Sequence, residues 1–360
     1  MPLKNRSYFA LILLLIFTMS MGALRAEEQE KKSFDIKEMI FTHVLDSYEW
    51  HIMTIGKKNI SIPLLIIVKG EDGWHAFSSS KLRDGQQYNG FYLSKEGKNK
   101  GKVVTKNQAG EEMRPKLDIS FTKNAASIII ASIALIIIML SIAAQYKKDP
   151  IRPMKGFGGA IEQLTMSVYN DVIKPNIPND YQKFAPYLLT VFYFIFLNNL
   201  LGLIPLFPGG ANVTGNIAVT LILALLTFII TNVFGKKEYW KEIFWPDVPV
   251  FLKTPLFPLM QFIEFIGMLT KPFALTIRLF ANMLAGHMIV LVLMGLIFIF
   301  YIMMGVGGAL GISVISIAFG IFMLLLDVLV SFIQAYVFTI LSAIFIGMAR
   351  PEERQVQKSN

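Results

Sequence analysis

The chain has 360 residues, of which 54% are hydrophobic and 16% charged, and its formal net charge is +9. Its uninterrupted apolar runs are too long to be buried inside a soluble domain, so the composition indicates a polytopic membrane protein. The positive charge does not indicate nucleic-acid binding, because lysine and arginine cluster at the ends of apolar segments and in the polar N-terminal third. The lack of cysteine excludes disulfides, thiolate metal sites and thiol nucleophiles.

Residues 1–26 are typical of a secretory signal peptide. Lys4 and Arg6 give a basic start, an apolar run follows, and small residues precede Glu27. An uncleaved first membrane span is the alternative, although about fifteen apolar residues is short for one. In either case, the segment that follows is expected to be exported.

Residues 27–123 are polar and contain short β-like runs at 60–68 and 74–78, separated by turn-forming residues. Three of the four histidines fall here, but none has the spacing of a metal-binding pair. We therefore predict a small extracytoplasmic β-rich domain without a metal.

Residues 124–350 are predicted to form an all-α membrane domain, followed by a cytoplasmic tail over 351–360. An amphipathic segment over 156–174 and a proline-rich segment over 245–258 are expected to lie along the membrane surface. Basic residues that follow the first, third and fifth crossings place those ends in the cytoplasm. The five membrane-crossing helices are expected over 125–146, 185–205, 213–234, 260–301 and 312–348.

The last two of these helices are longer than a bilayer requires. Residues 260–301 would extend about 60 Å as a helix and residues 312–348 about 55 Å, against about 30 Å of hydrocarbon. We expect both to be strongly tilted or kinked, with Pro272 as one break point. The glycine-rich segment 305–308 is expected to form the turn between them.

One arginine lies where arginine is energetically expensive. Between Pro272 and Ala349 the chain carries two formal charges, Arg278 and Asp327, and one imidazole, His287. A guanidinium at membrane depth costs about 2.5–3.5 kcal/mol on insertion scales, and it keeps its proton. Another group must therefore compensate the charge of Arg278.

Helical geometry groups the polar residues of the two long helices. Asn282 lies one turn after Arg278 on the same face, and His287 points about 180° away. Asp327 and Gln334 share a face of the last helix. His287 and Asp327 can titrate whereas Arg278 cannot, and this division suits proton handling.

Purely structural roles are alternative interpretations. Arg278 could be paired permanently with Asp327 inside the chain. His287 and Gln334 could make hydrogen bonds between helices, and Glu264 could lie at the level of the lipid headgroups.

Other motifs carry less weight. Asn198 and Asn199, within an apolar helix, are interpreted as polar packing groups. Residues 210–215 have the glycine spacing of a phosphate loop, but Asn216 and Ile217 follow where Lys and Ser or Thr are required, so no nucleotide is expected there. No other enzyme motif is evident, and we expect no catalytic residue, metal or cofactor.

Three segments resemble subunit a of the F-type ATP synthase. They are LTKPFALTIRLFANMLAGH at 269–287, FLNNLLGLIP at 196–205 and IQAYVFTILSAIFIGMA at 333–349. The resemblance covers residues 125–350. It implies a non-catalytic stator subunit of the bacterial inner membrane that provides two offset half-channels for protons, while the ATP chemistry occurs on other subunits.

The same resemblance implies the partners. They are the c-subunit ring, b-type peripheral-stalk subunits and the lipid bilayer, with no nucleic acid and no directly bound nucleotide. Arg278 corresponds to the essential arginine, which would pair transiently with each ring carboxylate and block a direct leak between the half-channels. Asn282 matches a polar residue one turn later, and Gln334 matches the glutamine that faces the arginine.

The resemblance also implies roles for three titratable residues. His287 and Asp327 match an interacting histidine and acid, here in the order found in mitochondrial forms, and Glu264 matches an acid that lines an access path. The exported region is longer than the usual N-terminus of the family. It could pack on the outer half-channel or contact other stator subunits.

Two further functions remain open. A self-contained ion or anion carrier would use Arg278 as its substrate site, although such carriers commonly show paired repeats with broken helices that are not evident here. A non-transporting scaffold would hold an internal pair of Arg278 and Asp327.

Overall fold

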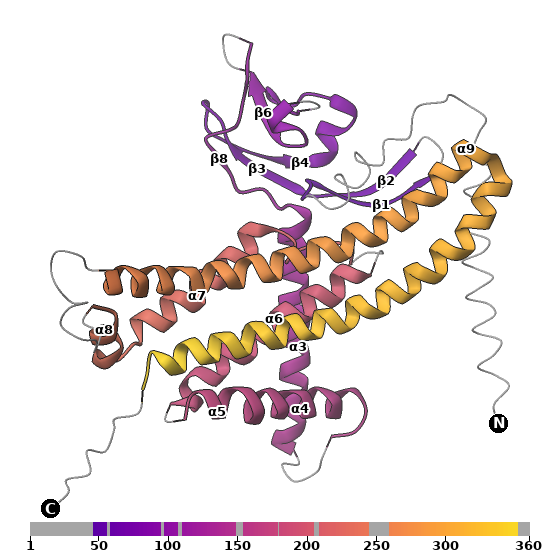
Figure 1. Ribbon diagram of the computed structural model, residues 1–360. Helices are drawn as coiled ribbons and strands as arrows, with labels where there is room; N and C mark the ends of the chain where they lie inside the picture. The colour runs from indigo at the N-terminus through magenta and orange to yellow at the C-terminus, as the bar shows by residue number, and fades with distance from the viewer. Residues whose placement is uncertain are drawn as a thin grey trace, which may run out of the picture.

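The computed structural model describes residues 46–55, 58–94, 97–106, 110–148, 154–178, 180–204, 209–244 and 259–351. The predicted signal peptide, the proline-rich segment 245–258 and all but the first residue of the predicted tail lie outside these residues. The described chain comprises a small β-rich N-terminal domain and a larger set of long helices (Figure 1).

The predicted β-rich domain is confirmed. It contains three small antiparallel sheets with the strand orders β1-β2, β4-β3-β8 and β5-β6-β7. Two short 3-10 helices, η1 (Ser79–Gly85) and η2 (Gly97–Asn99), connect strands. The strands are β1 (Glu49–Ile55), β2 (Lys58–Pro63), β3 (Leu65–Lys69), β4 (Trp74–Ser78), β5 (Phe91–Leu93), β6 (Val103–Lys106), β7 (Glu112–Met113) and β8 (Leu117–Asp118).

Alternating side chains on β3 build the core of this domain. Ile66 and Val68 are fully buried, as the period-two pattern of a half-buried strand requires. They belong to one apolar cluster with Phe77 of β4, Phe91 of β5 and Val103 of β6. The cluster therefore joins two of the three sheets into one unit.

The helices follow the domain directly, and each of the five predicted apolar segments is helical over most of its length. By length and composition α3, α6 and α9 could each cross a membrane, and α7 counts as a fourth if it is taken together with α8, from which it is bent by 102°. The helices are α3 (Lys123–Lys148), α4 (Phe157–Ser167), the π-helical η3 (Val168–Ile173), α5 (Lys174–Asn176), α6 (Tyr181–Leu203), α7 (Ile217–Val233), α8 (Lys237–Phe244) and α9 (Leu259–Met348).

α9 is a hairpin of two long arms that run across α3 rather than along it (Figure 1). The predicted turn over 305–308 is wrong in extent, because only Gly305, with φ 67° and ψ −159°, leaves the helical conformation. This backbone conformation is accessible essentially to glycine alone. The predicted break at Pro272 is also wrong, since the helix continues through this residue with the loss of one backbone hydrogen bond.

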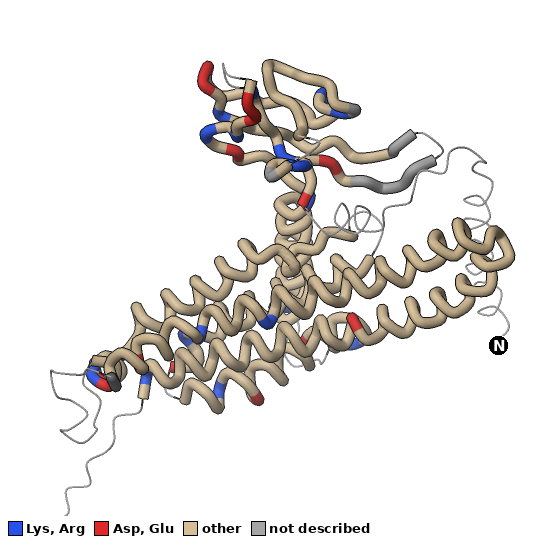
Figure 2. Tube along the Cα trace, turned by 45° about the horizontal axis from the view of Figure 1, so that its top comes forward, with Lys and Arg blue, Asp and Glu red and all other residues tan. Residues whose placement is uncertain are grey.

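The main apolar core lies where α6 and α7 pack on the two arms of α9. Phe192 and Leu188 of α6 meet Leu279 of the first arm and Phe338 of the second. Charged residues gather in the N-terminal domain and near the ends of helices, while the long arms are almost free of them (Figure 2). The few charged groups on the arms therefore lie among apolar residues, which makes them candidates for a functional role.

We predict that Gly305→Ala destabilises the α9 hairpin by about 1–3 kcal/mol, because a Cβ is disfavoured at this backbone conformation. The matched control is Gly307→Ala, where the added Cβ meets no atom within 4 Å. Thermal unfolding of the purified chain in detergent checks both variants. Equal unfolding temperatures for the two variants would contradict the prediction.

Candidate functional site

Arg278 lies on the open face of the first arm of α9. Both Arg278 and Asn282 are exposed, and they lie one turn apart on a continuous helix, so they share a face as predicted. Their neighbours Phe273 and Ile277 are exposed too, with 63% and 42% of their surface accessible. This face of α9 is therefore apolar apart from one cation and one amide.

The guanidinium of Arg278 has no counter-charge in the described part of the chain. No ion pair or hydrogen bond joins Arg278 to any other described residue. Asp327, the acid that a permanent internal pair would require, is itself described and lies in no ion pair. The internal pair that was considered as an alternative is therefore not formed in this structure.

His287 points away from Arg278, toward α6. Its Nδ1 lies 3.0 Å from the carbonyl oxygen of Met283, one turn earlier, and its Nε2 lies 3.2 Å from the carbonyl oxygen of Gly202 near the end of α6. A neutral imidazole can donate only one of these hydrogen bonds, whereas the protonated ring can donate both. The site can therefore hold the ring in both protonation states, as proton transfer requires.

Asp327 of the second arm approaches the first arm closely at Gly286, the residue before His287. A Cβ added to Gly286, the residue before His287, would lie 2.7 Å from Oδ1 of Asp327. Only 8% of Asp327 is exposed, and its Oδ2 has no hydrogen-bond partner among the described residues. The structure thus brings the Asp327 carboxylate of the second arm against Gly286, the residue that precedes His287 on the first arm.

The other two predicted residues lie apart from this pair. Gln334 is buried on the second arm, on the same side as Asp327, with 7% of its surface exposed. Glu264 is half-buried near the start of α9, far along the helix from His287. It interacts electrostatically with Lys271.

A small cleft at this end of α9 was not predicted from the sequence. It lies between α7, α8 and α9, and Thr227, Thr231, Asn232 and Lys271 contribute to its lining. Together with Thr220, these threonines form a buried polar stripe along α7 at intervals of seven and four residues. That spacing is the signal in the sequence that could have revealed it.

Asn198 and Asn199, interpreted as packing groups, are both buried near the end of α6, about one helical turn before Gly202, which contacts His287. Oδ1 of Asn199 accepts a hydrogen bond of 2.5 Å from the Thr214 hydroxyl. In the described residues, however, Oδ1 of Asn198 and Nδ2 of Asn199 have no partner. Packing among the described residues therefore leaves these two polar atoms without a hydrogen bond.

Comparison with known proteins shows to which family the helical part of the chain is similar. The family described as ATP synthase A chain matches residues 126–347. A second family, described as Domain of unknown function (DUF8433), matches residues 39–127, which include the β-rich domain.

Curated relatives match mainly in the helical part. ATP synthase subunit a of Chloroherpeton thalassium is 43% identical over 237 residues, which are 66% of this chain and 68% of the relative. ATP synthase subunit a 2 of Chlorobaculum tepidum is 47% identical over 233 residues, or 64% of each chain. ATP synthase subunit a of Myxococcus xanthus is 39% identical over 239 residues, 65% of this chain and 74% of the relative.

Proposed function

Because the chain belongs to the ATP synthase A chain family, we propose that it is the proton-translocating stator subunit of a bacterial rotary ATP synthase. In this role it carries no catalytic residue, and the synthesis or hydrolysis of ATP occurs on other subunits. Its partners are a ring of c subunits, b-type peripheral-stalk subunits and the lipid bilayer.

The observation that carries the proposal is the uncompensated guanidinium of Arg278. The side chain is exposed on an apolar helix face and has no counter-ion among the described residues. Such a charge is too costly to leave in hydrocarbon alone. A membrane carboxylate on each subunit of a neighbouring ring supplies the missing charge, and the ring covers the open face.

The alternative of a self-contained carrier is less well supported. A carrier would hold its anionic substrate within its own helices, near the middle of the membrane. Arg278 instead points out of the chain, on the face of α9 opposite to His287 and α6. This direction favours a partner protein over an enclosed substrate.

Two access paths can be assigned on this basis. His287, Asp327 and the polar end of α6 form the outer half-channel, and the cleft near Lys271 with Glu264 forms the inner one. Arg278 lies between them along α9 and blocks direct passage, because its proton is not lost at physiological pH. Gln334 and Asn282 provide hydrogen-bonding groups in the same region.

The same proposal fixes the orientation in the inner membrane. α3, α6, α7 and the two arms of α9 make five crossings, the β-rich domain lies outside the cytoplasm, and the C-terminus lies inside. Lys147 and Lys148 at the end of α3 and Arg350 after α9 support this orientation. Each arm of α9 exceeds the hydrocarbon thickness of about 30 Å, so the arms must be strongly tilted.

We predict that Arg278→Ala abolishes ATP-driven proton pumping, because protons can then pass between the half-channels without rotation of the ring. The measurement is quenching of a pH-sensitive dye in membrane vesicles that contain the assembled complex. Co-purification of the c ring with the variant shows that assembly is intact. Normal pumping by such an assembled variant would refute the proposed function.

We also predict that Gly286→Ala slows proton pumping several-fold, because the added Cβ would displace the carboxylate of Asp327 from His287. Gly267→Ala on the same arm is the matched control, since its Cβ would meet no atom within 4 Å. The same vesicle assay compares the two variants. A Gly286→Ala variant that pumps as fast as the control would show that this pair does not carry the protons.

A further inference from the structure

We propose that the β-rich domain is the outer wall of the proton access path, and that Trp50 is a positioning residue that holds the α6–α7 loop over His287. The inference rests on the proposed function and assigns a role to the domain that the subunit a match leaves unexplained. It also places the outer mouth of the path at the first turns of α3.

Trp50 joins the domain to the membrane helices. It lies on β1, only 3% of its surface is exposed, and its indole nitrogen donates a hydrogen bond of 3.1 Å to the carbonyl oxygen of Gly209, 159 residues later. It is packed with Ala211 and Val213 of the same loop. Burial of a tryptophan of the domain against this loop indicates that the domain is packed on the helices rather than only tethered to them.

This loop is in turn in contact with the titratable site. A Cβ added to Gly202 would lie 3.1 Å from the carbonyl oxygen of Ala211 on one side and 3.5 Å from the ring of His287 on the other. Gly202 is also the residue whose carbonyl oxygen faces Nε2 of His287. Trp50 therefore packs with Ala211, the Ala211 carbonyl lies close to Gly202, and Gly202 faces His287, so a shift of the loop can be passed on to the ring.

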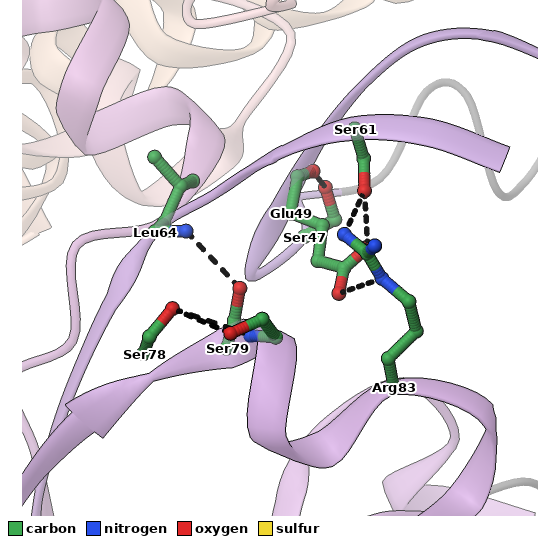
Figure 3. A network of polar contacts seen from close by, with 8 residues as sticks. Ser47, Glu49, Ser61, Leu64, Ser78, Ser79 and Arg83 are labelled. Carbon is green, nitrogen blue, oxygen red and sulfur yellow. Dashed lines mark hydrogen bonds and ion pairs between the residues drawn. The ribbon is translucent and has the colours of Figure 1, made fainter.

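A polar network within the domain holds Glu49, the residue before Trp50 (Figure 3). Arg83 of η1 forms an ion pair of 3.3 Å with Glu49, the residue before Trp50, and donates a hydrogen bond of 2.6 Å to Ser61 on β2. The Ser61 hydroxyl donates to Glu49 at 2.7 Å. The β1–β2 hairpin is thus fixed to the rest of the domain at the point where its tryptophan enters the loop.

The first turns of α3 carry polar side chains on their buried face. Asn124 and Ser127 lie one turn apart on its buried face, with 4% and 1% of their surfaces exposed. Lys123, at the start of the same helix, is also buried. The same turns supply Ala126 and Ile130 to the cluster around Trp50.

Several buried polar atoms around the start of α3, the end of α6 and Asp327 have no hydrogen-bond partner among the described residues. A buried polar atom without a hydrogen bond costs about 1–3 kcal/mol, so such atoms are normally satisfied by water. Eight buried side-chain atoms of the described residues have no partner, and six of them belong to the outer part of α3, α6, the α6–α7 loop and Asp327. The six are Oδ1 of Asn124, Oγ of Ser127, Oδ1 of Asn198, Nδ2 of Asn199, Nδ2 of Asn212 and Oδ2 of Asp327. A line of water from the domain to His287 and Asp327 would satisfy them.

The first test asks whether the start of α3 is reached by water. The chain has no native cysteine, so Ser127→Cys introduces a single thiol into the complete complex. Silver ion is added from outside to spheroplasts, and unreacted thiol is then labelled with a maleimide in detergent. Thiols react as thiolates, which form poorly in apolar surroundings.

We expect silver to protect the Ser127→Cys thiol at least tenfold better than the thiol of Ile133→Cys, which lies on the exposed apolar side of α3 with 52% of its surface accessible. Equal protection of the two thiols would overturn the proposed path. Because this readout does not depend on proton flux, it can fail while the Arg278 prediction holds, and the reverse is also true.

The second test concerns Trp50 itself. Trp50→Ala is expected to slow ATP-driven proton pumping several-fold with the c ring still bound, and Trp50→Phe, which keeps most of the packing, is expected to restore part of the rate. Trp74→Ala in the same domain, with 55% of Trp74 exposed, is the matched control. A Trp50→Ala complex that pumps like the Trp74→Ala complex would overturn the positioning role.

Discussion

The whole arrangement depends on one uncompensated charge, the guanidinium of Arg278 on the apolar face of α9. The free energy of an arginine at membrane depth cannot be lowered by losing its proton, so it must be lowered by a partner. Because the described part of the chain provides none, this face is best understood as half of an interface whose other half carries carboxylates. In the proposed function, a moving ring of such carboxylates would neutralise the arginine at each step without pairing with it permanently.

The first arm of α9 carries the permanently charged Arg278 and the titratable His287 on opposite faces. Nine residues from Arg278, His287 faces the opposite way and meets Gly202 of α6 and, beside Gly286, Asp327 of the second arm. The two groups that can titrate therefore lie inside the chain, whereas the permanently charged Arg278 is exposed on the opposite face. Through Gly202 and the α6–α7 loop, the inner side is also connected to Trp50 and the β-rich domain.

Much of this could be predicted from the sequence because it follows from helical periodicity. The shared face of Arg278 and Asn282, the opposite direction of His287 and the shared face of Asp327 and Gln334 need only a continuous helix. Which of these faces is buried depends on packing and does not follow from the spacing. The sequence predicts a turn over residues 305–308 and a break at Pro272, whereas only Gly305 leaves the helical conformation. Packing of the whole hairpin, which local preference does not describe, keeps the helix continuous elsewhere. The contact of Trp50 with Gly209 could not be predicted, since it joins residues 159 positions apart without any local pattern.

The most direct test of the central claim is a disulfide between this chain and the ring. Asn282→Cys lies on the exposed face one turn from Arg278, and a second cysteine can be placed beside the membrane carboxylate of the c subunit. Oxidation of the assembled complex should join the two chains at this position, and a cysteine at Gly286, on the side of Asp327, should give no such product. If the ring were instead cross-linked at Gly286 and never at Asn282, the charge of Arg278 would face no rotor and the account would be wrong.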